Sequence, residues 1–134
     1  MLFIEDMTTC ESCESVEALI LRAVEVWKHD QLVNLTPTWK QEPQGHYLAE
    51  TLSKRLDCEA SLGQLLSHEN EIVVAYSLVA LEIMDSTLLG RLPNELIERK
   101  QLFTRLEGSF AIDYELAEFA KEIQKQWFEK HRQS

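Results

Sequence analysis

Glycine, proline and cysteine are scarce in this chain of 134 residues, which contains four glycines, three prolines and three cysteines. The glycines are far apart in the sequence, so no glycine-rich loop is present that could cradle a phosphate. Neither a Gly-x-Ser-x-Gly turn nor a His-Glu-x-x-His motif occurs, which excludes two common hydrolase signatures. An odd number of cysteines is typical of a reducing compartment.

Basic residues are in the minority. Thirteen lysines and arginines stand against 23 aspartates and glutamates, which gives a net charge of −10. Proteins that bind nucleic acids gain much of their affinity from cations on phosphates, so this balance argues against a nucleic-acid partner. It argues equally against an anionic membrane surface, whereas a basic protein partner is compatible with it.

The sequence also lacks a long apolar run. The N-terminal residues MLFI are followed at once by Glu5 and Asp6, and the first basic residue is Arg22, so we expect no secretory signal. No apolar stretch reaches the roughly 20 residues of a membrane-spanning helix. The sequence therefore predicts a cytoplasmic protein without a membrane partner.

Helical periodicity is the main positive signal. Apolar residues recur at spacings of three and four, as on one face of a helix. The pattern predicts helices at 15–29, 46–57, 60–67, 71–84, 93–108 and 113–132. We expect Pro93 in the first turn of the fifth helix, Gly108 at its end, and Asp113 as the N-cap of the last. No convincing strand is visible, although residues 1–4 fit either an edge strand or a frayed arm.

Residues 30–45 interrupt the helical pattern. Pro37, Pro43 and Gly45 prevent a continuous helix. Apolar residues such as Trp39 distinguish the segment from a free linker. We expect a packed, proline-containing loop over the core of a single helical domain that comprises the whole chain, 1–134.

The helix predicted at 71–84 is apolar on every side. Its only clearly polar side chains are Glu71, Ser77 and Glu82. A helix of this kind must be covered on every side. We therefore expect it to be an inner helix, enclosed on both flanks, with the Ser77 hydroxyl bonded to a carbonyl one turn earlier.

Part of this region resembles a HEAT-type helical repeat, over about residues 62–84. In such a repeat, a short helix that ends in two leucines meets a polar corner, and a helix with a valine, small residues and an Ala-Leu pair follows. The matching positions are Leu65, Leu66, Asn70, Val73, Ala75, Ser77, Ala80 and Leu81. Two positions depart from the pattern, Glu71 where proline is common and Val74 where arginine is usual. The resemblance implies an all-α fold of about six helices stacked as antiparallel pairs, a HEAT-like α-α array; an irregular α-bundle is the alternative.

The cysteines and histidines are the candidates for chemistry. Cys10 and Cys13 form a Cys-x-x-Cys at the entrance to the first helix, where a thiol pKa is lowered. A zinc site needs about four ligands, which Cys58 and His68 would have to complete. A thioredoxin-like site needs a preceding strand, which is not visible. We interpret these cysteines as incidental or capping residues, and we expect no cofactor and no catalytic residue.

Two Glu/His pairs share a helix face at four-residue spacing. They are Glu25 with His29 and His46 with Glu50. Di-iron bundles use a Glu-x-x-His spacing, which neither pair has. We interpret both pairs as surface contacts.

Two acidic clusters are the candidate binding residues. One lies at the start of the first helix and the other at the polar corner. Their members are Glu11, Glu14, Glu17, Glu69 and Glu71. Carboxylates near a helix N-terminus interact favourably with the helix dipole, and they also attract a cationic partner.

We therefore expect a non-catalytic protein-interaction module with an acidic surface, whose partner is another protein that the sequence does not identify; the charge permits a basic partner but does not require one. A small protein that masks a basic target, as immunity proteins do, is one concrete version. The alternative is a metal- or thiol-dependent enzyme or sensor that uses the Cys-x-x-Cys and the histidines. The sequence also permits self-association.

Overall fold

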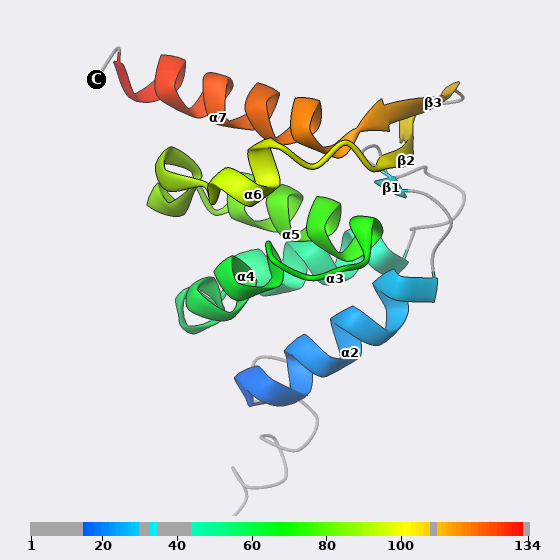
Figure 1. Ribbon diagram of the computed structural model, residues 1–134. Helices are drawn as coiled ribbons and strands as arrows, with labels where there is room; N and C mark the ends of the chain where they lie inside the picture. Colours follow the sequence, from blue (N-terminus) through cyan, green and yellow to red (C-terminus); the bar gives the residue numbers. More distant parts are fainter. Residues whose placement is uncertain (1–14, 30–32, 35–43, 108–109, 133–134) are drawn as a thin grey trace, which may run out of the picture.

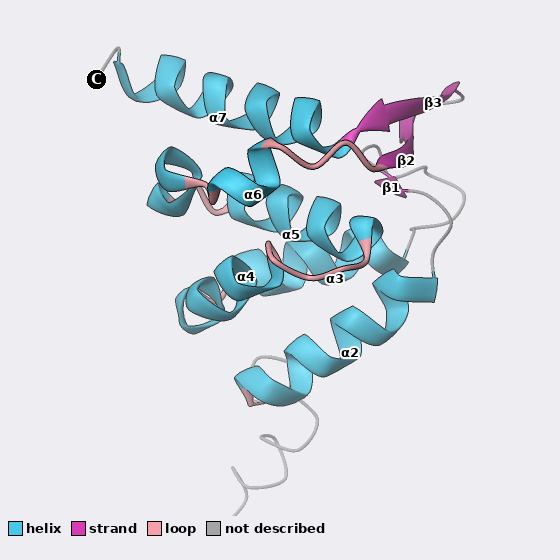
Figure 2. Ribbon diagram, viewed as in Figure 1, coloured by secondary structure: helices cyan, strands magenta, loops and turns pink. Residues whose placement is uncertain are grey.

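The computed structural model describes residues 15–29, 33–34, 44–107 and 110–132 (Figure 1). Most of the described chain is helical, with a small sheet at one end (Figure 2). The elements in chain order are α2 (Val16–His29), β1 (Val33–Asn34), α3 (Gln44–Ser53), the 3-10 helix η2 (Leu56–Cys58), α4 (Glu59–Leu65), α5 (Glu71–Ile83), the 3-10 helix η3 (Thr87–Arg91), α6 (Asn94–Ile97), β2 (Leu102–Glu107), β3 (Phe110–Glu115) and α7 (Leu116–Arg132).

The helices lie in successive layers (Figure 1). Helix α2 forms one outer layer, α3 and α4 come next, α5 and α6 follow, and α7 forms the opposite outer layer. The predictions of a mostly helical chain and of the first four helices are confirmed, with ends displaced by a few residues. The largest displacement is at the second helix, which ends at Ser53 and is followed by a turn and η2.

Helix α5 is the centre of the core. Every residue from Ile72 to Leu81 is buried. The helix packs against α2, α3 and α4 on one flank and against α7 on the other, so the predicted enclosure is confirmed for residues 72–81, whereas Glu82 and Ile83 at the end of the helix are exposed. Asn70 caps its start, accepting hydrogen bonds from the backbone N–H groups of Ile72 and Val73. The hydroxyl of Ser77 donates to the carbonyl of Val73, as expected.

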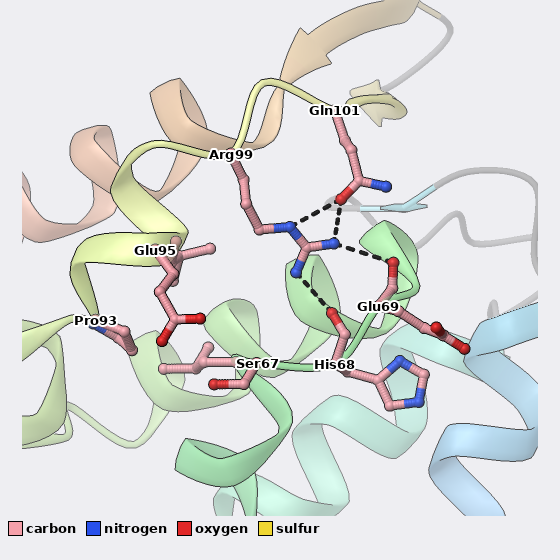
Figure 3. Close-up of a pocket in the computed structure, with 9 residues that line it drawn as sticks. Ser67, His68, Glu69, Pro93, Glu95, Arg99 and Gln101 are labelled. Atoms are coloured by element: carbon pink, nitrogen blue, oxygen red, sulfur yellow. Dashed lines mark hydrogen bonds between the residues drawn. The ribbon is translucent and has the colours of Figure 1, made fainter.

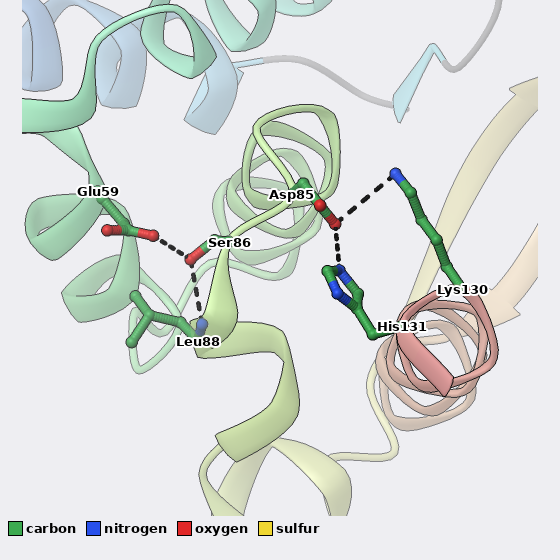
Figure 4. Close-up of polar contacts among 6 residues, drawn as sticks. All are labelled: Glu59, Asp85, Ser86, Leu88, Lys130 and His131. Atoms are coloured by element: carbon green, nitrogen blue, oxygen red, sulfur yellow. Dashed lines mark hydrogen bonds and ion pairs between the residues drawn. The ribbon is translucent and has the colours of Figure 1, made fainter. Parts of the chain in front are cut away.

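The loop after α5 ties α7 to the core (Figure 4). Asp85, at a φ of 56°, ends the helix and accepts a hydrogen bond at 2.9 Å from Nε2 of His131, with Nζ of Lys130 at 3.7 Å. The hydrogen bond to His131 is the main cause that lowers the pKa of Asp85. Ser86 donates to the carboxylate of Glu59 at 2.5 Å and accepts from the backbone N–H of Leu88. The contacts of Asp85 hold the C-terminal ends of α5 and α7 together, and the bond of Ser86 joins the loop to the start of α4.

The prediction of a fifth helix from Pro93 to Gly108 is wrong. Helix α6 ends at Ile97, and β2 and β3 then form an antiparallel hairpin, paired from Leu102↔Glu115 to Glu107↔Phe110. The strand β1 adds in parallel to the other edge of β2. Apolar and polar residues alternate from Ile112 to Glu115, which fits strand periodicity, and pairing with β2 completes the hairpin.

Two further predictions concern this part of the chain. Asp113 lies inside β3 and is not the N-cap of the last helix, which begins at Leu116. Residues 1–4 and most of the predicted loop at 30–45 lie outside the described residues; residues 33–34 form β1, and 44–45 begin α3. No helix in the described ranges combines the length and the apolar composition needed to cross a bilayer.

Candidate functional site

The acidic residues predicted to bind a partner do not gather at one place. Glu11 and Glu14 lie outside the described residues. Glu17 is exposed in the first turn of α2 and lines a groove between α2 and α4. Glu69 lines a different groove, of about 400 Å³, at the corner before α5. Glu71 begins α5 and is partly buried.

The corner before α5 is clamped by an arginine (Figure 3). Arg99 donates from Nη1 to the carbonyl of His68 at 2.6 Å and from Nη2 to the carbonyl of Glu69 at 3.0 Å. Its Nε also donates to Oε1 of Gln101 at 2.8 Å, and the amide of Gln101 donates to the carboxylate of Glu71 at 3.4 Å. A cation of the chain itself therefore compensates part of the negative charge at this corner.

The candidates for thiol or metal chemistry remain dispersed. Cys10 and Cys13 lie outside the described residues. Cys58 is buried, and burial raises the pKa of its thiol, which makes it a poor nucleophile. Within the described ranges, no three side chains of His, Cys, Asp or Glu are placed to hold a metal ion.

The two Glu/His pairs differ in their surroundings. Glu25 lies 3.1 Å from Nζ of Lys28 and 3.5 Å from Nε2 of His29 on the exposed face of α2, and the hydrogen bond with Lys28 is the main cause that lowers its pKa. In the second pair, Nε2 of His46 lies 3.8 Å from Oε2 of Glu50, and His46 is buried. The first pair is a surface contact, whereas the second lies at the edge of a cleft.

This acidic cleft has a volume of about 390 Å³ and lies among α3, α5, β2 and α7. It is lined by His46, Glu50, Val79, Glu82, Ile83, Arg105, Phe119, Glu122, Ile123 and Gln126. Its apolar lining includes Val79, Phe119 and Ile123, each of which is at most 4% exposed. Three carboxylates from three different helices therefore share one cleft with an apolar wall.

The carboxylates of the cleft influence one another. The pKa of Glu82 is raised, first by desolvation and then by repulsion from Glu122, while Lys130 acts in the opposite direction. Glu122 accepts a hydrogen bond from the hydroxyl of Tyr114, which raises the pKa of that phenol. The guanidinium of Arg105 lies over the ring of Tyr114, 4.1 Å from its centroid. The acidic cleft thus holds the carboxylates of Glu82 and Glu122 together with the guanidinium of Arg105, and repulsion from Glu122 is the second cause that raises the pKa of Glu82.

Sequence reasoning missed this cleft. Glu50, Glu82 and Glu122 are more than 30 residues apart in the chain, and no motif joins them. Two signals were available, the His46/Glu50 pair and Glu82, a carboxylate on a mostly apolar helix. The three carboxylates meet because each helix is oriented about its own axis so that its glutamate faces the cleft. Tertiary packing sets that orientation.

No family model, no curated protein and no solved structure matches this chain.

Proposed function

We propose that this chain is a non-catalytic module that binds a basic protein in the cytoplasm, and that its acidic cleft receives a lysine or arginine side chain of that partner. The observation that carries the proposal is the convergence of Glu50, Glu82 and Glu122 on one cleft with an apolar wall. The net charge of −10 supports it, because complementary charge accelerates association and selects among partners.

The cleft fits the two parts of a long cationic side chain. The methylene stem of lysine or arginine packs on apolar surface while its charged head stays among polar groups. Ile83, which is 47% exposed, offers that surface, and the carboxylates of Glu82 and Glu122 offer acceptors for the head. Binding would also relieve the repulsion between these two carboxylates, which raises the pKa of Glu82 in the unbound chain.

The proposal includes an architecture in which the helices stack as a HEAT-like array. Helix α5 lies between the layer of α3 and α4 and the outer helix α7, in the manner of an inner helix of such an array. The resemblance over residues 62–84 supports that comparison. Masking of a basic target protein is the concrete version that we favour, because the chain is small and strongly acidic.

Affinity capture from the native extract, at low and at high salt, tests the proposal. The bait is the whole chain, compared with the double variant Glu82→Gln/Glu122→Gln. The control is Glu118→Gln/Glu129→Gln, which removes the same charge from exposed positions of α7. We expect a basic protein to bind at low salt, to dissociate at high salt, and to be lost with the cleft variant only. Equal capture by the two variants, or a partner that is not basic, would contradict the proposal.

A further inference from the structure

The hairpin ends in an edge strand. The strand order of the sheet is β1-β2-β3, so within the described part of the chain β3 pairs with β2 alone. One row of β3 backbone groups therefore faces away from the sheet. Such a row is a template on which another extended segment can add by main-chain hydrogen bonds.

The hydrogen bonds at the end of the hairpin show which residues form this row. The backbone N–H of Leu116 donates to the carbonyl of Gln101 at 2.8 Å, one step beyond the Leu102↔Glu115 pair. Bonded and non-bonded pairs alternate along an antiparallel ladder. Ile112 and Tyr114 thus exchange backbone bonds with β2. The N–H and C=O groups that point outward belong to Ala111, Asp113 and Glu115.

Strand β3 lacks three of the features that protect edge strands, although Asp113 and Glu115 give it negative charge. Natural edges are often blocked by lysine, proline or a bulge. Strand β3 contains no lysine and no proline, and its register with β2 runs without a break. Ala111, Ile112 and Asp113 are exposed, and Ile112 is 43% exposed although it is apolar.

The side chains of β3 define the pattern of a complementary strand. Asp113 and Glu115 lie on one face of the sheet, whereas Ile112 and Tyr114 lie on the other. Neighbouring strands place paired side chains on the same face, where opposite charges and apolar pairs stabilise the sheet. The complementary segment therefore carries cations beside Asp113 and Glu115 and apolar residues between them.

We propose that β3 accepts an extended segment of the basic partner as an added strand, with lysine or arginine alternating with apolar residues. This inference rests on the proposed function and specifies how the partner is held. The edge and the acidic cleft are connected, because Tyr114 of β3 donates its hydroxyl hydrogen bond to Glu122 of the cleft. A segment on β3 would thus lie close to the place where a cationic side chain enters the cleft.

Fluorescence anisotropy with a labelled peptide, Lys-Val-Lys-Val-Lys, tests the inference on the whole chain. The control peptide, Lys-Lys-Lys-Val-Val, has the same composition and charge without the alternation. The test variant is Ala111→Pro, which removes an outward N–H without a change of charge, at an edge position where proline is tolerated. We expect the dissociation constant to rise about tenfold for the control peptide and about tenfold for the variant.

Hydrogen exchange on the wild-type chain gives a second measurement that does not depend on the folding of a variant. With the alternating peptide bound, the amides of Ala111, Asp113 and Glu115 should exchange more slowly, whereas those of Ile112 and Tyr114 are already bonded to β2. Unchanged exchange at the outward amides would overturn the inference. Equal binding of the two peptides, with no effect of Ala111→Pro, would also overturn it, while the loss of partner capture in the cleft variant would still uphold the proposed function.

Discussion

Glu82 illustrates how one side chain of a candidate site can weaken a fold. It stands near the end of the most buried helix and shares the acidic cleft with Glu122. Its pKa in the folded chain lies above the ordinary value of 4.5. Between these two values the folded state binds more protons than the unfolded state, so this group makes the protein less stable as the pH rises through that range.

The substitution Glu82→Gln should therefore increase the free energy of unfolding at pH 7 only slightly, because the carboxylate is exposed and solvent screens both its desolvation and its repulsion from Glu122. The gain should shrink as the pH falls toward 4.5, where the wild-type carboxyl becomes protonated in both states. Urea unfolding at pH 7 and pH 5 measures both effects. Glu129→Gln, at an exposed position of α7, is the control and should show neither effect. A loss of stability in Glu82→Gln at pH 7 would contradict this account.

The two described tryptophans offer a matched pair of tests for a buried hydrogen bond. Trp27 is fully buried, stacks on Tyr76 with 5.4 Å between the ring centroids, and donates from Nε1 to the carbonyl of Gly45 at 2.9 Å. Trp127 is partly buried, and its Nε1 has no hydrogen-bond partner within the described part of the chain.

Trp27→Phe should destabilise the chain by about 2–4 kcal/mol, since it leaves a small cavity and a buried carbonyl without its donor. Trp127→Phe makes the same chemical change and should cost distinctly less, because it breaks no such bond. Urea unfolding of the two variants, followed by circular dichroism, makes the comparison. Equal losses would show that the bond from Trp27 to Gly45 contributes little.

At the scale of elements, the helices of the first two thirds of the chain could be predicted because their signals are local. The apolar residues of 15–29 recur at helical spacing, and the polar corner before Glu71 contains the N-cap of the next helix. Both signals lie within a few residues of the helix that they predict. The hairpin was missed because Phe103 and Leu106 also fit helical spacing, and they continue the pattern of the short helix α6. Pairing of β2 with the neighbouring strand β3 decided the outcome, and strand preference depends strongly on such pairing.

Two glycines that lie close to neighbouring elements should respond differently to alanine. A Cβ on Gly90 of η3 would lie 2.9 Å from Cζ3 of Trp127, a rigid ring on α7. A Cβ on Gly63 of α4 would also lie 2.9 Å from a neighbour, but that atom is Cδ1 of Leu88, the end of a flexible side chain. In addition, alanine is favoured over glycine inside a helix such as α4.

Gly90→Ala should therefore cost about 1–3 kcal/mol, because η3 and α7 must separate to accept the methyl group. Gly63→Ala should change stability by about 1 kcal/mol or less, since the preference for alanine in a helix offsets the displacement of Leu88. Urea unfolding of both variants measures the difference. A Gly90→Ala variant as stable as the wild type would show that the contact between η3 and α7 adjusts freely.

At the scale of the whole molecule, composition predicted the sign of the surface charge but could not locate the candidate site. The acidic cleft forms where Glu50 of α3, Glu82 of α5 and Glu122 of α7 lie close together. Their spacing in the sequence does not predict this proximity. The clusters that spacing did indicate, such as Glu69 and Glu71, lie beside Arg99, a neighbour from 30 residues away. Charge patterns thus predicted an acidic surface, and packing determines where its carboxylates meet.

The layered arrangement around α5 leads to a prediction about how the molecule opens. Helix α5 is enclosed by α2, α3 and α4 on one flank and by α7 on the other, so its amides become accessible only when both sides separate. The hairpin lies at one end of the molecule, and β3 is bonded to β2 alone within the described residues. Local opening requires few broken contacts at the hairpin and many at α5.

Native-state hydrogen exchange should therefore show that the amides of residues 74–81 exchange with the free energy of global unfolding, as measured independently with urea. The amides of Ile112 and Tyr114 should exchange at a lower free energy, through opening of the hairpin alone. At low urea concentrations, the exchange free energy in α5 should fall as steeply with urea as the free energy of global unfolding does. In β3 it should fall much less steeply, because opening the hairpin exposes less surface. If residues 74–81 exchanged as readily as those of β3, α5 would open without the helices around it, and its place as the centre of the core would have to be abandoned.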